Sequence, residues 1–141
     1  MSLTVKAKIA CEIAGINPAR FNEMIHAGQY TCAPETKPGS ARIFNLDQIV
    51  ALKIFGNLLS MAVVPERAGH IACNAYSLFA GRDDDVSVIY SIRRNGDRMM
   101  VLEIHGDNNP LPEFCMVFDI PGLRKEIIRH LESQNQAVSE E

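Results

Sequence analysis

Residues 10–72 decide the fold of this chain, and two short stretches within them carry the signal: AGINP at 14–18 and KPGSAR at 37–42. In the first stretch the glycine suits the end of a helix, and Asn17 followed by Pro18 suits the start of the next one. The second stretch holds two cations and almost no apolar bulk, as an exposed loop requires. The predicted order is helix, tight turn, helix, basic loop and long helix.

Apolar residues at helical spacing predict four helices in the first 80 residues. Asn45 and Gln48 have the spacing of a capping box, and the helix that they open is so apolar that we expect it at the centre of the core. A short strand is predicted at 41–44, where the chain returns from the basic loop. The helices are expected at Val5–Ala14, at Pro18–Ala27, from Leu46 onwards and at Pro65–Phe79.

A polar break at 81–85 separates this part from a region with the pattern of strands. Residues 86–92 and 99–104 are β-like, and the Asn-Gly pair at 95–96 favours a two-residue hairpin turn between them. Both faces of this hairpin are largely apolar, so we expect it to be covered on both sides. The predicted register places Ile92 opposite Met99, Tyr90 opposite Val101, Val88 opposite Glu103 and Ile89 opposite Leu102.

A third strand is predicted at 114–118, followed by an amphipathic helix from Pro121 to about Leu131 and a polar tail from Gln134. The whole pattern indicates an α+β fold. Its parts are a winged helix-turn-helix of about four helices with a short wing (1–80), a β-hairpin with a third strand and a C-terminal helix (81–133), and a disordered tail (134–141).

Composition places the chain among ordinary globular proteins. It has 141 residues, of which 47% are hydrophobic and 22% charged, so a packed core is expected. No apolar run of about eighteen residues and no apolar signal core occur, so we expect a cytoplasmic protein with no membrane partner. The net charge is −3, but residues 1–70 carry +2 and residues 71–141 carry −5, so the positive part is the one with the helix-turn-helix pattern.

The four cysteines, Cys11, Cys32, Cys73 and Cys115, are widely spaced. Without a signal peptide they are expected to be reduced rather than bridged. His70 and Cys73 form the one pair at the short spacing of metal ligands, whereas structural zinc usually needs two such pairs. We therefore expect buried cysteines behaving as small apolar groups, and no metal site.

The sequence offers little support for catalysis. Residues 83–85 are three aspartates, which are expected to form a solvated loop rather than a cation site. A glycine-rich phosphate loop, a nucleophile elbow and a convincing acid–base pair are all missing. We expect no enzyme, no cofactor and no small-molecule effector.

The second helix and the basic loop are candidates for contacts with double-stranded DNA. Asparagine and arginine on an exposed helix face can bind base edges or phosphates, and cations flanking Pro-Gly-Ser suit a wing along the phosphate backbone. The alternatives are an ordinary solvated helix face and a plain surface loop. The expected DNA-contacting residues are Asn17, Arg20, Asn22, Glu23 and His26 in the helix, and Lys37, Ser40 and Arg42 in the loop.

About half of the chain, residues 8–72, resembles the DNA-binding domain of the MerR family of bacterial regulators. The resemblance implies a second helix in the major groove and a wing on flanking phosphates, with Asn22 where the family usually has arginine and Arg42 at the wing arginine. Prophage-type regulators and excisionases, which share this half with shorter additions, are the nearer likeness. The resemblance to the MerR family rests on Ile13–Pro18, Ala27-Gly28, Ala41–Phe44, Leu46–Ile49, Leu52–Ile54, Leu58–Ala62 and Val64–Glu66.

The chain also departs from the family. Glu23 and Met24 replace its aromatic pair in the reader helix, which puts the usual phosphate contacts in doubt. The family's long dimerising coiled coil and effector-binding cysteines are absent from this chain, so the resemblance does not imply that it senses an inducer.

The expected function is a bacterial or prophage-encoded transcriptional regulator that binds DNA as a homodimer. One short reader helix gives little affinity, so two linked copies are expected. The alternative is a winged protein–protein adaptor, such as a phage assembly or anti-host protein. The residues expected to join the two copies are Val88, Tyr90, Ile92, Met99, Val101, Leu123 and Ile127.

Overall fold

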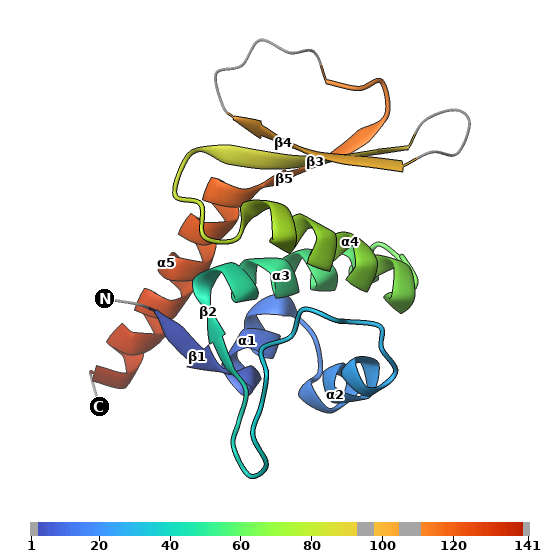
Figure 1. The fold of residues 1–141 in the computed structure, drawn as a ribbon. Coiled ribbons are helices and arrows are strands. Elements are labelled where there is room, and N and C mark those ends of the chain that lie inside the picture. Colours follow the sequence, from blue (N-terminus) through green and yellow to red (C-terminus); the bar gives the residue numbers. More distant parts are fainter. Residues whose placement is uncertain (1–2, 93–97, 105–110, 140–141) are drawn as a thin grey trace.

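A computed structural model describes residues 3–92, 98–104 and 111–139 of the chain (Figure 1). Within these ranges it contains five helices and two small antiparallel sheets, so the predicted α+β class is confirmed. In chain order the elements are β1 (Thr4–Lys6), α1 (Ala7–Ala14), α2 (Pro18–His26), β2 (Ile43–Asn45), α3 (Leu46–Ser60), α4 (Pro65–Phe79), β3 (Val86–Ile92), β4 (Arg98–Ile104), β5 (Cys115–Asp119) and α5 (Ile120–Ser139).

The turn between α1 and α2 forms as its residues predict. Gly15 ends α1 with a left-handed φ of 73°, and the side chain of Asn17 accepts a hydrogen bond of 3.1 Å from the backbone N–H of Arg20. The first helix, however, begins at Ala7 rather than at Val5. Residues 4–6 instead form β1, which pairs with β2 so that Val5 faces the buried Phe44. A pairing partner forty residues away therefore outweighs the local helical pattern.

Helix α3 is the centre of the core. Both halves of the capping box between Asn45 and Gln48 are present at its start. Its residues are buried nearly all round, and it packs against α1, α4 and α5. Gly56 permits the close approach of α1, because a Cβ there would collide with the backbone carbonyl of Ala14.

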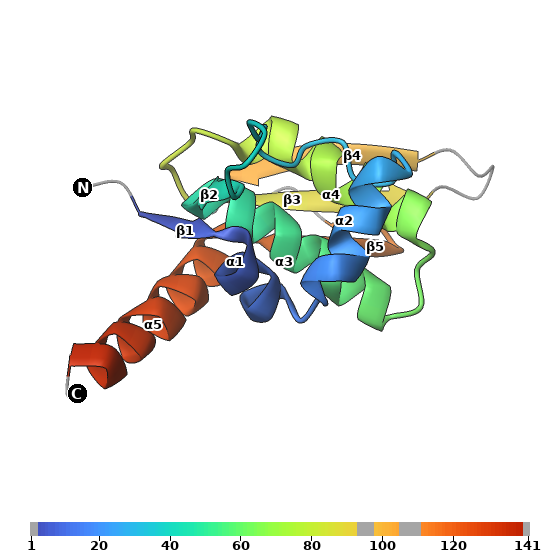
Figure 2. The same ribbon diagram turned by 90° about the horizontal axis from the view of Figure 1, so that it is seen from below.

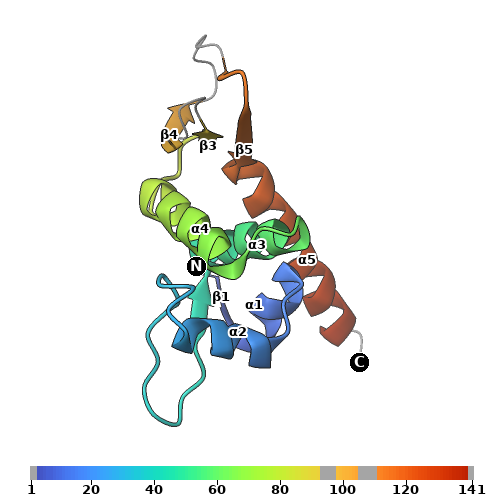
Figure 3. The same cartoon turned by 90° about the vertical axis from the view of Figure 1, so that its right-hand side faces the viewer.

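The three-stranded sheet has the order β4-β3-β5, and one of its faces packs on the helices (Figure 3). The predicted register is wrong by one residue, because Tyr90 pairs with Met100 and Val88 with Leu102. This shift brings two large apolar side chains of β4 onto the core face and leaves Val101 40% exposed on the other. The expected two-residue turn at 95–96 lies outside the described residues.

The outer face of the sheet carries Ser87, Ile89, Ser91, Val101 and Val117. No helix in the described part of the chain covers it, as the edge-on view shows (Figure 3). Ser87, Ile89 and Ser91 of the central strand are nevertheless buried on this face, whereas Val101 and Val117 of the two edge strands are exposed.

Helix α5 joins the two ends of the sequence to one core. Asp119 accepts a hydrogen bond of 3.1 Å from the Gly122 N–H at its start, and Arg124 forms an ion pair of 2.9 Å with Asp47 at the start of α3. The helix continues to Ser139, so the disordered tail expected from residue 134 is wrong. Residues on both sides of the domain boundary expected at residue 80 contribute to this one core.

The stability of the fold is expected to fall between about pH 9 and pH 11. Burial raises the pKa of the Cys11 thiol from its ordinary 9.0 to about 11, and burial also raises the pKa of Tyr30. Below pH 9 both folded and unfolded chains keep the thiol proton, whereas above it the unfolded chain releases that proton first. The free energy of unfolding therefore falls by up to about 2–3 kcal/mol because of this thiol.

Urea unfolding from about pH 8 to about pH 11 measures this loss. Cys11→Ala removes the thiol and should lose less stability across the same interval, with Tyr30 supplying the remainder. Equal losses in both proteins would contradict the assignment to Cys11.

Candidate nucleic-acid interface

Helix α2 presents an open polar face at the end of the molecule opposite the three-stranded sheet (Figures 1 and 2). Phe21 and Met24 anchor its inner side in the core at 1% and 4% exposure. The outer side is solvent-exposed, and no described helix or strand of the acidic C-terminal half lies against it. The predicted contact residues on this face are Asn17, Arg20, Asn22, Glu23 and His26, all exposed.

The basic loop projects beside α2 and extends past it (Figure 3). Its tip is a tight turn in which the Thr36 hydroxyl donates to the Ser40 carbonyl at 2.7 Å and the Ser40 N–H donates to the Lys37 carbonyl at 3.0 Å. Gly39 has a φ of 80°, which favours glycine. Lys37 and Ser40 are therefore exposed at the tip, as predicted.

Arg42 lies differently from the other predicted contacts. Its guanidinium donates to the backbone carbonyl of Pro34 on the opposite side of the loop, and the residue is partly buried. The contact closes the loop across its base. Arg42 thus supports the position of Lys37 in addition to any contact that it makes with a phosphate.

A disulfide between Cys32 and Cys73 fixes the start of this loop to α4, with a Cα–Cα distance of 5.5 Å. The expectation that these two cysteines are reduced is therefore wrong, whereas Cys11 and Cys115 are free thiols. No local pattern predicts this bond, because 41 residues separate the two cysteines and only the folded loop brings them together. Cys73 is consequently not available as a metal-ligand partner for His70.

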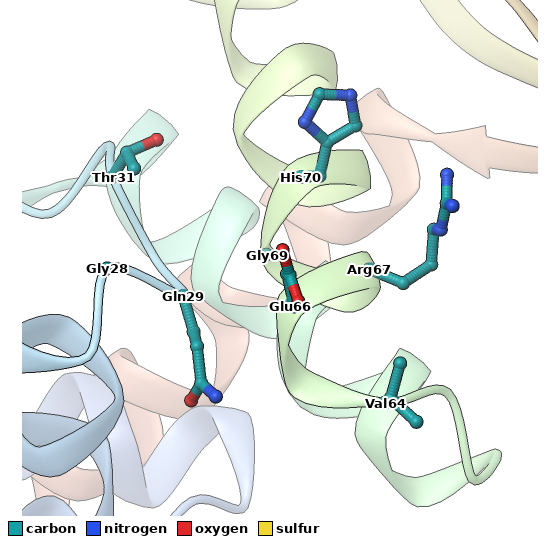
Figure 4. Close-up of a pocket in the computed structure, with 8 residues that line it drawn as sticks. All are labelled: Gly28, Gln29, Thr31, Val64, Glu66, Arg67, Gly69 and His70. Atoms are coloured by element: carbon teal, nitrogen blue, oxygen red, sulfur yellow. The ribbon is translucent and has the colours of Figure 1, made fainter.

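A groove with a volume of about 490 Å³ lies between this part of the loop and the start of α4 (Figure 4). Gln29 and Thr31 line it from the loop, and Arg67 and His70 line it from α4. Gly69 makes the close packing possible, since a Cβ there would collide with the Gln29 carbonyl oxygen. None of these residues was predicted as part of the site, because no local pattern connects the loop with α4.

The charges across this end of the molecule alternate. The cations Arg20, Lys37 and Arg67 are interspersed with carboxylates from Glu23, Glu35 and Glu66. The surface therefore lacks the uniformly basic character of many nucleic-acid interfaces.

The residues predicted to join two copies lie mainly inside the molecule. Val88, Tyr90 and Ile127 are buried in the chain's own core, and Leu123 packs against it. Val88 and Tyr90 lie on the face of β3 that packs on the helices, so they serve the sheet–helix packing rather than contact with a second copy. Val101 is exposed, and the side chains of Ile92 and Met99 lie outside the described part.

Comparison with models of known protein families gives no match, and comparison with curated proteins gives none either. Among the described residues no group of three or more histidine, cysteine or acidic side chains is arranged to hold a metal ion. No helix in the same ranges has both the length and the apolar character needed to cross a membrane.

Removing the disulfide should loosen the loop selectively. We expect Cys73→Ala to lower the free energy of unfolding by about 2–4 kcal/mol, since the bond closes a long stretch of chain. Limited proteolysis should then cleave within residues 31–42 before it cleaves the helices. Cys115→Ala is the matched control, and similar cleavage of both variants would show that the bond does not hold the loop.

Proposed function

We propose that this chain is a sequence-specific regulator that binds double-stranded DNA through a winged helix-turn-helix, with residues 8–72 built in the manner of the MerR family. One observation carries the proposal: the polar face of α2 and the tip of the basic loop both lie at the end of the molecule opposite the three-stranded sheet, where no other described helix or strand covers them (Figures 1 and 3). The tight turn at Gly15–Asn17 gives α1 and α2 the connection that such a reader needs.

The dimensions of α2 suit the major groove. An α-helix with its side chains is about 10–12 Å in diameter, which fits the major groove, about 12 Å wide. The Asn17 side chain is occupied by the N-cap, so Asn22 and His26 are the better candidates for base edges. Arg20, one turn before Glu23, is placed for a phosphate.

The loop supplies the second contact. Lys37 at its tip is a flexible cation without bulky neighbours, and such a group neutralises a backbone phosphate without reading sequence. The Arg42–Pro34 hydrogen bond and the Cys32–Cys73 disulfide hold the loop in place, which reduces the entropy lost on binding.

Loss of the cation at residue 37 should weaken binding to all duplex sequences. For Lys37→Ala we expect the slope of log K against log salt to fall by about 0.9, the value for one phosphate. Arg42→Ala should also lower affinity but change the slope less, because its guanidinium already binds the Pro34 carbonyl. Lys125→Ala, in an exposed residue of α5, is the control. An unchanged slope for Lys37→Ala would remove the loop from the interface.

The proposed contact of α2 with base edges is tested by the preference among duplex sequences rather than by the overall affinity for DNA. Selection of bound duplexes from a random pool should return a different sequence for Asn22→Ala than for the wild-type chain. One lost base contact should reduce discrimination by about 1–3 kcal/mol at a single position. Identical selected sequences would contradict the role of Asn22.

A second function is favoured by one observation, the carboxylates of Glu23 and Glu35 within the same surface. They suit a protein–protein adaptor that keeps this fold without using it on DNA. Binding to mixed genomic fragments across a salt series separates the two functions. Steep salt dependence supports the regulator, and no binding at low salt supports the adaptor.

A further inference from the structure

Strand β5 is an open edge of the three-stranded sheet. In the order β4-β3-β5 it has β3 on one side and no strand on the other among the described residues. Edge strands usually carry lysine, proline or a bulge that discourages pairing. Cys115–Asp119 contains no lysine or proline and has its one charge at the last position, whereas the opposite edge, β4, carries Arg98 and Glu103.

An apolar groove of about 570 Å³ runs beside this edge. Its walls come from α3, from β5 and from the first turns of α5, and Met61 at its rim is 63% exposed. The residues that line the apolar part of the groove include Ile54, Leu58, Met61, Phe118 and Leu123. The groove therefore offers backbone hydrogen-bonding groups and an apolar pocket to the same incoming segment.

The segment just before β5 has the complementary character. Phe114 is 74% exposed and Leu111 is 56% exposed, unusually high values for large apolar side chains. Phe114 precedes Met116 by two residues and Phe118 by four, and both of these side chains face the helices. Alternate residues of a strand lie on the same face of the sheet. If the strand is extended by one residue, Phe114 lies on the face where the groove opens.

We infer that β5 pairs antiparallel with β5 of a second copy of this chain, about a twofold axis at Val117, and that Phe114 of each copy enters the groove of the other. In this register Met116 lies opposite Phe118 of the second copy, so apolar side chains meet. The outer-face residues Ile89 and Val117 then continue across the axis as one strip. Phe114 lies opposite Ile120 of the second copy, beside its Leu123.

A second copy is favoured over an unrelated partner because one chain carries both halves of the contact. Phe114 directly precedes the five-residue strand, and residues 116–119 of that strand line the groove, so a twofold axis at Val117 brings each phenylalanine toward the groove of the other copy. The shared area is small, so a dissociation constant on the order of 1–100 µM is expected. The inference rests on the proposed function for its purpose, since paired half-sites need two reader helices, but its test needs no DNA.

Sedimentation of the full chain without DNA tests the contact. From about 1 µM to about 200 µM the wild-type chain should change from monomer to dimer. Phe114→Gln and Val117→Lys should each raise the dissociation constant at least about tenfold, by removing the anchor or by bringing two lysines together. Val101→Lys is the matched control, because it has similar exposure on the same face but belongs to the other edge strand.

Two results would overturn the inference. One is a wild-type chain that stays monomeric throughout the series. The other is a Val101→Lys variant as impaired as Val117→Lys, which would indicate packing between outer faces. If the dimer forms as expected but DNA is not bound, the proposed function is wrong and the inference about the β5 contact still holds.

The register has its own test. In a Cys115→Ser background, Val117→Cys places two thiols opposite each other at the axis, within the Cα separation that a disulfide accepts. Mild oxidation should link the two copies through residue 117, whereas Val101→Cys in the same background should not cross-link. Equal yields from both variants would exclude the proposed pairing.

Discussion

Helix α3 is buried on nearly all its sides, and the other helices are arranged around it. A helix this apolar cannot face water, so α1, α4 and α5 must cover it. Each large side chain buried there contributes about 1.5–3 kcal/mol, and the cover includes elements from both ends of the sequence. Arg124 of α5 adds an ion pair with Asp47 at the first turn of α3. The N-terminal and C-terminal parts are therefore one folding unit.

This arrangement also separates two surfaces. Helix α2 and the loop lie at one end of the α3 core, and the sheet with its β5 edge lies at the other (Figure 1). Contacts made at one end leave the other end open. A protein that reads duplex DNA as a pair of linked copies needs this separation, because the joining surface must not block the reading surface.

Local signals predicted most of the elements. The N-cap at Asn17 and the capping box at Asn45 satisfy backbone N–H groups within a few residues. Pro65 opens α4 because it has no N–H that needs a partner and its fixed φ suits a helix. These local effects act the same way in any surroundings. Features that depend on distant residues were missed. They are the β1–β2 pairing, the strand register, the Cys32–Cys73 disulfide and the Arg42–Pro34 contact. The predicted contact residues on α2 are exposed, but the groove beside them required the approach of the loop to α4 at Gly69, which no local pattern shows.

We propose that the α3 core holds α2 and the loop open for a duplex while the sheet faces away. This arrangement can be tested by amide hydrogen exchange of the full chain, measured with and without duplex DNA at low salt. We expect new protection within residues 18–26 and 36–41, with exchange in β3 and β5 unchanged at constant oligomeric state. Protection confined to the sheet, or none at any site, would contradict it.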